Sequence, residues 1–125
     1  MTKVLITGVN GFVASHLVDH ILYDSPNTEI YGTIRRLADK KNISTSLNMI
    51  HLKEMEMTDS YSVNSVIEDV RPDIIFHMAA QSYVPSSWTS PANTLQTNVI
   101  GTMNVLEAVR TIDNHILTVI SGSSE

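Results

Sequence analysis

The stretch that decides the fold is Gly8-Val9-Asn10-Gly11-Phe12-Val13-Ala14, which has the spacing G-x-x-G-x-x-A. It follows a short apolar run, Lys3–Thr7, that is typical of a strand, and it opens a helical pattern over residues 11–23. In such a turn the first glycine permits the tight bend, and the small third residue lets the helix pack closely on the strand. The stretch therefore predicts the start of a strand–helix–strand unit.

The same turn has the chemistry of a phosphate-binding loop. The second glycine, Gly11, lets a pyrophosphate approach the backbone, and the start of the helix offers free N–H groups with a partial positive charge. A dinucleotide is the ligand that this context favours. The alternative is a plain strand-to-helix turn that binds no ligand.

Apolar runs and helical periods alternate along the rest of the chain. Strand-like runs occupy residues 3–7, 29–34, 48–54, 73–78 and 115–120, and helical patterns occupy residues 11–23, 59–70 and 90–112. Residues 37–47 fit a loop or a short helix, and the serine- and proline-rich stretch before Ser90 fits a loop. This alternation predicts an α/β fold, a doubly wound parallel sheet with strand order 3-2-1-4-5 and the fifth strand at an edge.

The helical patterns carry apolar stripes and start signals. Asp59 is an expected N-cap, and Ser90-Pro91 supplies an N-cap followed by a proline at the first helical position. The apolar residues that mark one face of each helix are Val13, Leu17 and Ile21; Val63, Val66, Ile67 and Val70; and Leu95, Val99, Met103 and Leu106.

Length and composition exclude several classes of protein. The 125 residues fit one domain, a dinucleotide-binding domain over 1–125, and the 8 basic against 13 acidic residues argue against a nucleic-acid partner. The chain has no cysteine, its N-terminal apolar run is too short for a signal peptide, and no run is long enough for a membrane span. We expect a cytoplasmic protein without a membrane partner. His16 and His20 have a spacing that can hold zinc, but the glutamate of such motifs is missing, so we expect no metal.

The second predicted strand ends in Arg35-Arg36, with no carboxylate at its tip. In many dinucleotide-binding folds an acid at this point accepts a hydrogen bond from the ribose 2′-hydroxyl. An acid would repel a 2′-phosphate, whereas a guanidinium can bind it with two hydrogen bonds. The sequence therefore favours NADP over NAD, and the alternative is a pair of solvated surface arginines.

Three runs together resemble the extended short-chain dehydrogenase/reductase family, which has a Rossmann-like fold. They are the run from Thr7 to Leu17, the run His77-Met78-Ala79-Ala80-Gln81-Ser82-Tyr83-Val84, and the run from Thr97 to Ala108. Within that family the most similar branch contains GDP-mannose 4,6-dehydratase and GDP-4-keto-6-deoxy-mannose reductase. Its cues are Gly32-x-x-Arg35-Arg36, Ala79-Ala80-Gln81-Ser82 and Ser123-Ser124-Glu125.

The resemblance implies roles for individual residues toward the cofactor. The pyrophosphate is expected at Gly8, Asn10, Gly11, Phe12 and Val13, and the 2′-phosphate at Arg35, with Arg36 beside it. Met78, Ala79, Ala80, Gln81 and Ser82 are expected to line the ribose and nicotinamide side. Glu56 and Met57 stand where the family has an Asp-Leu pair that touches the adenine. Asn98 is expected to support the active site, and the helix that contains Gly101 to form a homo-oligomer interface.

The resemblance also implies an activity, dehydration or reduction of a nucleotide sugar, with a GDP-sugar as the expected partner. Ser123 matches the residue that hydrogen-bonds the sugar hydroxyl, and Glu125 matches the dehydratase glutamate that handles the C5 proton. The family's Tyr-x-x-x-Lys pair is missing, since no tyrosine here has a lysine four residues later. We therefore expect the NADP-binding portion of such an enzyme, without its sugar-binding portion and inactive by itself. The alternative is a stand-alone dinucleotide-binding module or remnant without turnover.

Overall fold

A parallel sheet with the order β3-β2-β1-β4-β5 forms the centre of the computed structural model, which describes residues 1–123. The strands of this part of the chain are β1 (Lys3–Thr7), β2 (Glu29–Ile34), β3 (His51–Glu54), β4 (Ile74–His77) and β5 (Leu117–Ile120). The predicted strand order is confirmed, as are the bounds of β1 and β2, and the other three strands are shorter than the sequence pattern suggests.

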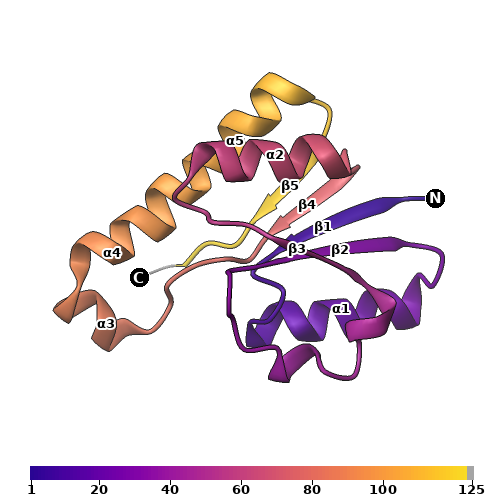
Figure 1. Ribbon diagram of the computed structural model, residues 1–125, viewed down its shortest axis with the longest axis horizontal. Helices are drawn as coiled ribbons and strands as arrows, with labels where there is room; N and C mark the ends of the chain where they lie inside the picture. Colours follow the sequence, from indigo (N-terminus) through magenta and orange to yellow (C-terminus); the bar gives the residue numbers. More distant parts are fainter. Residues whose placement is uncertain (124–125) are drawn as a thin grey trace.

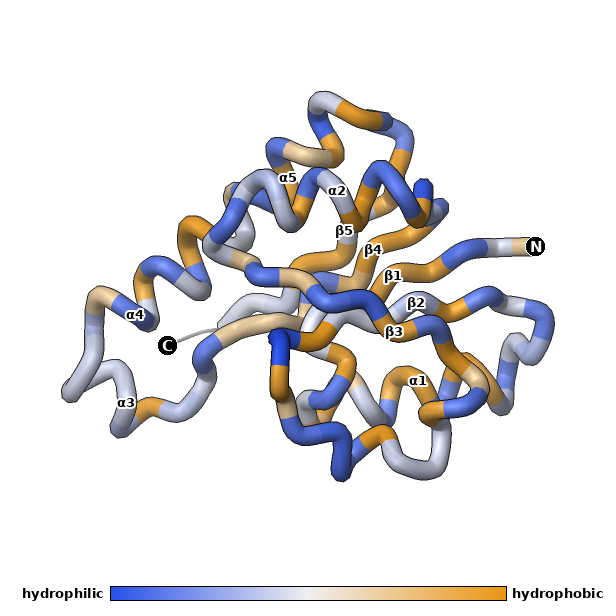
Figure 2. The backbone as a smooth tube through the Cα atoms, in the orientation of Figure 1, coloured by the Kyte–Doolittle hydropathy of each residue, from blue (hydrophilic) through white to orange (hydrophobic). Residues whose placement is uncertain are grey.

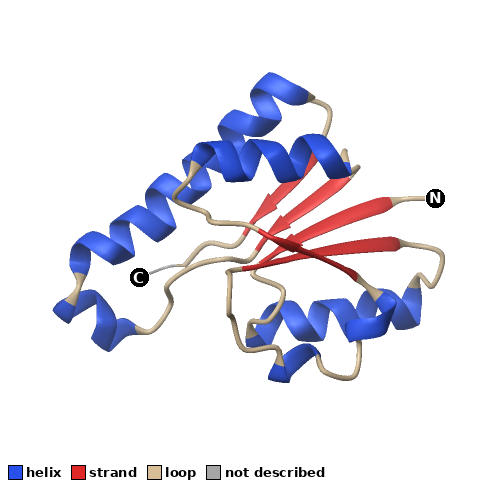
Figure 3. Ribbon diagram, in the orientation of Figure 1, coloured by secondary structure: helices blue, strands red, loops and turns tan. Residues whose placement is uncertain are grey.

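Helices cover both faces of the sheet (Figures 1 and 3). One face carries α1 (Phe12–Asp24) with the short turns η1 (Lys41–Ile43) and η2 (Leu47–Met49), and the other carries α2 (Ser60–Val70) and α5 (Gly101–Ile112). Beyond the carboxyl ends of the strands lie α3 (Val84–Thr89), α4 (Pro91–Leu95) and the π-helical turn η3 (Gln96–Ile100), which leads directly into α5.

Alternation along β1 divides the core into two halves. Leu5 faces the layer that contains α2 and α5, whereas Val4 and Ile6 face the layer that contains α1. The tube coloured by hydropathy shows apolar stretches in β1, β4 and β5, whereas the edge strand β3 is mostly hydrophilic (Figure 2). The predicted stripe of α2 is confirmed, because all four of its apolar residues are buried, and the Asp59 carboxylate caps α2 by accepting from the Tyr61 N–H at 3.0 Å.

The predicted stripe of α1 is confirmed in part, and that of the last helix is wrong. In α1, Leu17 and Ile21 are partly buried against the core beside Ala14 and Val18, whereas Val13 is 60% exposed. In α5 the buried residues include Gly101 and Asn104, whereas the stripe is exposed at Leu95, Val99, Met103 and Leu106. Small and polar residues can occupy the core face of α5 because this helix packs closely against the segment that follows β3. A Cβ on Gly101 would lie 3.2 Å from the Cβ of Met57, and the Asn104 amide donates to the Met57 carbonyl at 2.7 Å.

Two segments depart from the expected elements. Helix α3 forms where the sequence suggests a loop, because Pro85 stands in its first turn and the Ser87 hydroxyl donates to the Val84 carbonyl at 2.6 Å. The single helix expected over residues 90–112 is interrupted by η3, where the Thr102 hydroxyl donates to the Asn98 carbonyl at 2.6 Å. Such π-helical turns in helices are frequent at functional sites.

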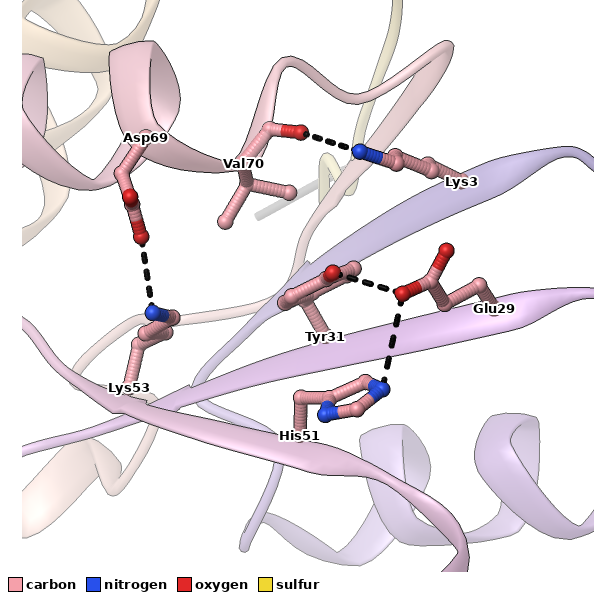
Figure 4. Close-up of polar contacts among 7 residues, drawn as sticks. All are labelled: Lys3, Glu29, Tyr31, His51, Lys53, Asp69 and Val70. Atoms are coloured by element: carbon pink, nitrogen blue, oxygen red, sulfur yellow. Dashed lines mark hydrogen bonds and ion pairs between the residues drawn. The ribbon is translucent and has the colours of Figure 1, made fainter.

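A cluster of polar side chains joins β2, β3 and α2 (Figure 4). The Tyr31 hydroxyl donates to Glu29 at 2.7 Å, and its ring stacks on His51 with 4.7 Å between centroids. The hydrogen bond to Glu29 raises the pKa of Tyr31. On the same face of the sheet, Lys53 of β3 pairs with Asp69 of α2 at 2.7 Å. These contacts hold the short edge strand β3 in register.

Within residues 1–123, no helix is both long enough and apolar enough to cross a lipid bilayer.

Candidate dinucleotide-binding site

The glycine turn lies at the carboxyl end of β1, between β2 and β4 (Figure 1). From β1 the chain passes to β2 on one side through α1, whereas β4 pairs with β1 on the other side. Ligands of doubly wound sheets bind outside the carboxyl ends of the strands at such a switch in strand order. The structure therefore brings the predicted phosphate loop to the position where this fold binds its ligands.

Gly8 is required by the fold itself. Its φ is +63°, and a Cβ at this position would lie 2.8 Å from the Cα of Ala79. The Gly8 N–H donates to the Thr33 hydroxyl at 3.2 Å, and the next N–H, of Val9, donates to the Thr33 carbonyl at 3.0 Å. These bonds tie the turn to β2 and let the chain after β4 approach it closely.

Gly11 is not required in the same way. Its backbone has φ −70° and ψ 162°, which any residue adopts, and among the described residues a Cβ would meet only the Gly8 carbonyl oxygen, at 3.3 Å. Gly11 is the N-cap of α1, no side chain caps the helix there, and the first turn has no acidic residue. An uncapped helix start favours an anion, so the absence of a side chain at Gly11 suits a phosphate that approaches the backbone.

Asn10 joins this turn to the segment that follows β2. Its amide donates to the Asp39 carbonyl at 3.0 Å, and its own carbonyl accepts from the Asn42 amide at 3.0 Å. The side chains of the next two predicted residues, Phe12 and Val13, are exposed beside the turn, and the Phe12 ring contacts the edge of His16. The predicted pyrophosphate residues therefore form one continuous surface.

Arg35 and Arg36 follow the end of β2 and are exposed. Within residues 1–123, neither guanidinium has an ion-pair or hydrogen-bond partner from the protein. The next residue, Leu37, is 95% exposed and has a φ of 61°, a backbone conformation that a bulky residue rarely adopts. Two cations that no carboxylate of residues 1–123 engages thus stand one strand away from the glycine turn.

The segment after β4 lies beside the glycine turn and is held by two side chains. The buried Thr7 hydroxyl accepts from the N–H groups of Met78 and Ala79, each at 3.0 Å. Asn98 of η3 binds both backbone groups of Gln81, accepting from its N–H at 2.7 Å and donating to its carbonyl at 2.9 Å. Ala80 and Ser82, which lie next to these anchored residues, have exposed side chains.

Glu56 and Met57, expected near the adenine, follow β3 and differ in accessibility. The exposed Glu56 carboxylate accepts from the Thr58 hydroxyl at 3.1 Å and from the Thr58 N–H at 3.3 Å. The Met57 side chain is buried under α5, so this residue presents only its main chain to a ligand. Adenine contact at these two residues stays a prediction.

The predicted catalytic residues follow β5. Ser123 comes after the carboxyl end of this strand, on the same edge of the sheet as the glycine turn, and Glu125 lies outside the described residues. Among residues 1–123, no group of three or more histidine, cysteine, aspartate or glutamate side chains has the arrangement of a metal site.

His77, at the end of β4, is the titratable group that the fold buries most deeply at this site. Its Nδ1 lies 2.8 Å from the Thr7 hydroxyl and its Nε2 lies 3.1 Å from the Thr102 hydroxyl. Burial lowers the pKa of His77. The groups that face the ring are Thr7 from β1, Thr102 from α5 and Ile120 of the paired β5, and none of them is charged.

The stability of the chain is expected to fall as the pH drops below about 6.5, the ordinary pKa of histidine. The unfolded chain takes up a proton at His77 in a range where the folded chain does not, so the free energy of unfolding increases with pH there. The slope from one such group is at most about 1.4 kcal/mol per pH unit. Urea unfolding between pH 5.5 and 7.5 measures it, and His77→Gln is expected to flatten the dependence. An equal slope in the variant would contradict this assignment.

Sequence reasoning missed the supporting role of Thr7, Thr33, His77 and Thr102. Thr7, Thr33 and His77 are polar residues at or next to the carboxyl ends of three adjacent strands, and all three are buried. A polar residue that closes an apolar strand beside a glycine turn is a signal that could have marked them. Their partners could not be read from the sequence, because Thr7 and His77 are 70 residues apart.

Comparisons with known proteins agree with this geometry. The family model described as GDP-mannose 4,6 dehydratase matches residues 5–125. The dTDP-glucose 4,6-dehydratase of Salmonella typhimurium is 35% identical over an alignment of 115 residues, and the match covers 86% of this chain and 31% of that protein. The GDP-mannose 4,6-dehydratase of Vibrio cholerae is 29% identical over an alignment of 119 residues, and this match also covers 86% of this chain and 31% of that protein. The chain thus spans about a third of the length of these relatives.

This chain also resembles, in its fold, a solved structure of a protein that holds a bound dinucleotide. The Bordetella bronchiseptica enzyme WbmH in complex with NAD⁺ is 28% identical to this chain, with a TM-score of 0.73. The match covers 90% of this chain and 36% of the WbmH chain. The fold and the family model agree, and the chain belongs to the GDP-mannose 4,6 dehydratase family of nucleotide-sugar-modifying proteins.

Proposed function

We propose that this chain is the NADP-binding portion of a nucleotide-sugar 4,6-dehydratase or a related reductase. The observation that carries the proposal is the pair of turn glycines. Gly8 is required by the fold, whereas Gly11 has backbone angles that suit any residue, and among the described residues a Cβ there would meet only the Gly8 carbonyl oxygen, at 3.3 Å, beside an uncapped helix start. A bound pyrophosphate that lies against the backbone would explain why a glycine stands at this position.

The preference for NADP rests on the two arginines after β2. WbmH was solved with NAD⁺, so a dinucleotide without a 2′-phosphate is the competing ligand. In this chain the strand tip carries Arg35-Arg36 and no carboxylate, and the guanidinium groups have no protein partner within residues 1–123. Charge-assisted hydrogen bonds to a phosphate are about twice as strong as neutral ones, which favours the 2′-phosphate of NADP.

The sugar substrate is proposed from the family and from the residues after β5. The GDP-mannose 4,6 dehydratase family model supports a GDP-sugar, and the Salmonella typhimurium relative supports a dTDP-sugar as the competing substrate. Ser123 would hydrogen-bond the sugar hydroxyl, and Glu125 would handle the C5 proton of the sugar. Oxidation and return of the hydride would be the chemistry of the nicotinamide. The exposed stripe of Leu95, Val99, Met103 and Leu106 supports the expectation that copies of the protein associate.

Arg35→Ala is expected to weaken NADPH binding about 10- to 150-fold and to change NADH binding little. The variant removes a charge-assisted hydrogen bond worth about 1.5–3 kcal/mol, and NADH has no phosphate for that bond. Calorimetric titration of the intact chain and the variant with both dinucleotides measures the effect. Arg110→Ala, which removes an exposed arginine paired with Glu107 on α5, is the matched control. Equal affinity of the intact chain for NADPH and NADH would exclude the NADP preference, and binding of neither would exclude the proposed function.

A further inference from the structure

A continuous series of hydrogen bonds runs from β1 to the segment after β4. The Thr7 hydroxyl meets His77 Nδ1 at 2.8 Å, His77 Nε2 meets the Thr102 hydroxyl at 3.1 Å, and the Thr102 hydroxyl meets the Asn98 carbonyl at 2.6 Å. Asn98 then binds both backbone groups of Gln81. The series therefore begins and ends at side chains that hold the same segment, because Thr7 also accepts from the backbone N–H groups at its start.

Counting protons gives each bond of this series one direction. A threonine hydroxyl has one proton and two acceptor lone pairs, and both lone pairs of Thr7 are used by the N–H groups of Met78 and Ala79. The Thr7 proton therefore points to His77 Nδ1, which must be the unprotonated nitrogen of the ring. A neutral imidazole then carries its proton on Nε2 and donates it to Thr102, whose own proton goes to the Asn98 carbonyl.

The direction of the bonds matters because they span separate elements. Thr102 belongs to α5 and Asn98 to the π-helical turn η3, and the hydroxyl of Thr102 is the group that connects this turn to β4. If His77 were protonated or carried the other tautomer, its Nδ1–H would face an oxygen with no free lone pair. The cost of leaving a buried polar group without a partner opposes that state.

We propose that His77 is a positioning residue, which, as its Nε2–H tautomer, links β1 to η3 and thereby sets the place of residues 79–82 beside the glycine turn. The proposal rests on the proposed function in one respect, that residues 79–82 line the ribose and nicotinamide side of a bound dinucleotide. His77 acts through Thr102 and Asn98, and it contacts the ligand nowhere itself.

The first test reads the tautomer in the ligand-free chain. Nitrogen-15 NMR of the histidine rings at pH 7.5 distinguishes a protonated nitrogen from an unprotonated one. We expect His77 to show a protonated Nε2 and an unprotonated Nδ1 as a single species, whereas an exposed histidine such as His20 is expected to average between both tautomers. An Nδ1–H tautomer or an averaged signal at His77 would overturn the proposal.

The second test interrupts the series at Thr102, beyond the histidine, where a substitution leaves the buried ring in place. Thr102→Val keeps the shape of the side chain and removes the acceptor, so we expect the Gln81 amide to exchange with deuterium about tenfold faster. We expect NADPH affinity to fall about three- to tenfold, and Thr102→Ser to restore both values. Thr111→Val is the matched control, because the Thr111 hydroxyl binds only carbonyl groups of its own helix, those of Glu107 and Ala108.

The outcomes separate this proposal from the proposed function. If the intact chain binds no dinucleotide while Gln81 exchange responds to Thr102→Val and not to Thr111→Val, the positioning role stands and the proposed function fails. If the intact chain binds NADPH and the two valine variants behave alike in exchange and affinity, the positioning role is overturned and the proposed function stands.

Discussion

Thr7→Val is expected to lower the free energy of unfolding by about 3 kcal/mol, a large effect for an exchange that conserves volume. The hydroxyl is completely buried, with 0% of the residue exposed, and it serves three partners at once. Without it the N–H groups of Met78 and Ala79 lose their acceptor and His77 Nδ1 loses its donor. Each polar group left without a partner costs about 1–3 kcal/mol, and part of this cost is relieved where water reaches the half-buried N–H groups. Urea unfolding followed by circular dichroism measures the loss.

Two further variants show whether the hydroxyl is the cause. Thr7→Ser keeps the hydroxyl and removes one methyl group, so it is expected to cost only about 1 kcal/mol. Thr118→Val makes the same exchange on β5, where the hydroxyl has only a long bond of 3.4 Å to the Ile116 carbonyl, and it is expected to change stability by less than about 0.5 kcal/mol. A Thr7→Val protein as stable as the intact chain would show that the hydroxyl does not hold the segment after β4.

The fold was predictable because its main signals are local. Gly8 directly follows β1 and begins the turn. The apolar residues of α2 recur at helical spacing, and Asp59 stands where this helix needs an N-cap. Right-handed connections between successive parallel strands then allow few strand orders, and the order 3-2-1-4-5 is the usual one for a sheet that begins with a dinucleotide-binding turn. The bounds of β1 and β2 agree with the apolar runs for the same reason.

Which face of α5 is buried was not predictable, because both faces of this helix carry apolar residues. Leu106 and Met103 resemble core residues more than Gly101 and Asn104 do, yet the latter pair faces the core. What decides the orientation is Met57, which is far away in the sequence and offers a carbonyl to Asn104 and a side chain that fills the space at Gly101. Spacing within the helix contains no information about that partner.

The position of the glycine turn and a supporting role for Asn98 were predictable from the sequence, whereas the individual partners of the supporting side chains were not. The spacing of the turn glycines is by itself a local signal of a phosphate-binding turn, and the fold places them at the expected end of the sheet. The partners of Thr7 and of Asn98 come from other elements, so they follow from the fold and from no local pattern. The π-helical turn belongs with them, since it forms where Thr102 binds the Asn98 carbonyl.

Gly11→Val is expected to weaken dinucleotide binding about a hundredfold while leaving the fold intact. The backbone angles of Gly11 suit a β-branched residue, and the new Cβ meets only the Gly8 carbonyl oxygen among the described residues, so the loss of stability is expected to be about 1 kcal/mol. A phosphate that lies against the bare backbone would instead collide with the branched side chain. Overpacking a close contact costs about 1–3 kcal/mol or more, which corresponds to a loss in affinity of about a hundredfold.

A graded comparison separates the loss of a ligand contact from the loss of the fold. Gly11→Ala is expected to bind NADPH with an intermediate affinity, because its single methyl group intrudes less than the side chain of valine. Gly8→Val is expected to fail for the other reason, since a Cβ there lies 2.8 Å from the Cα of Ala79 in a backbone with φ +63°, and it should unfold in less urea than the intact chain. Calorimetry and urea unfolding of the three variants give two independent readouts. If Gly11→Val binds NADPH as tightly as the intact chain, the pyrophosphate lies elsewhere, because no phosphate can rest on this backbone beneath a valine side chain.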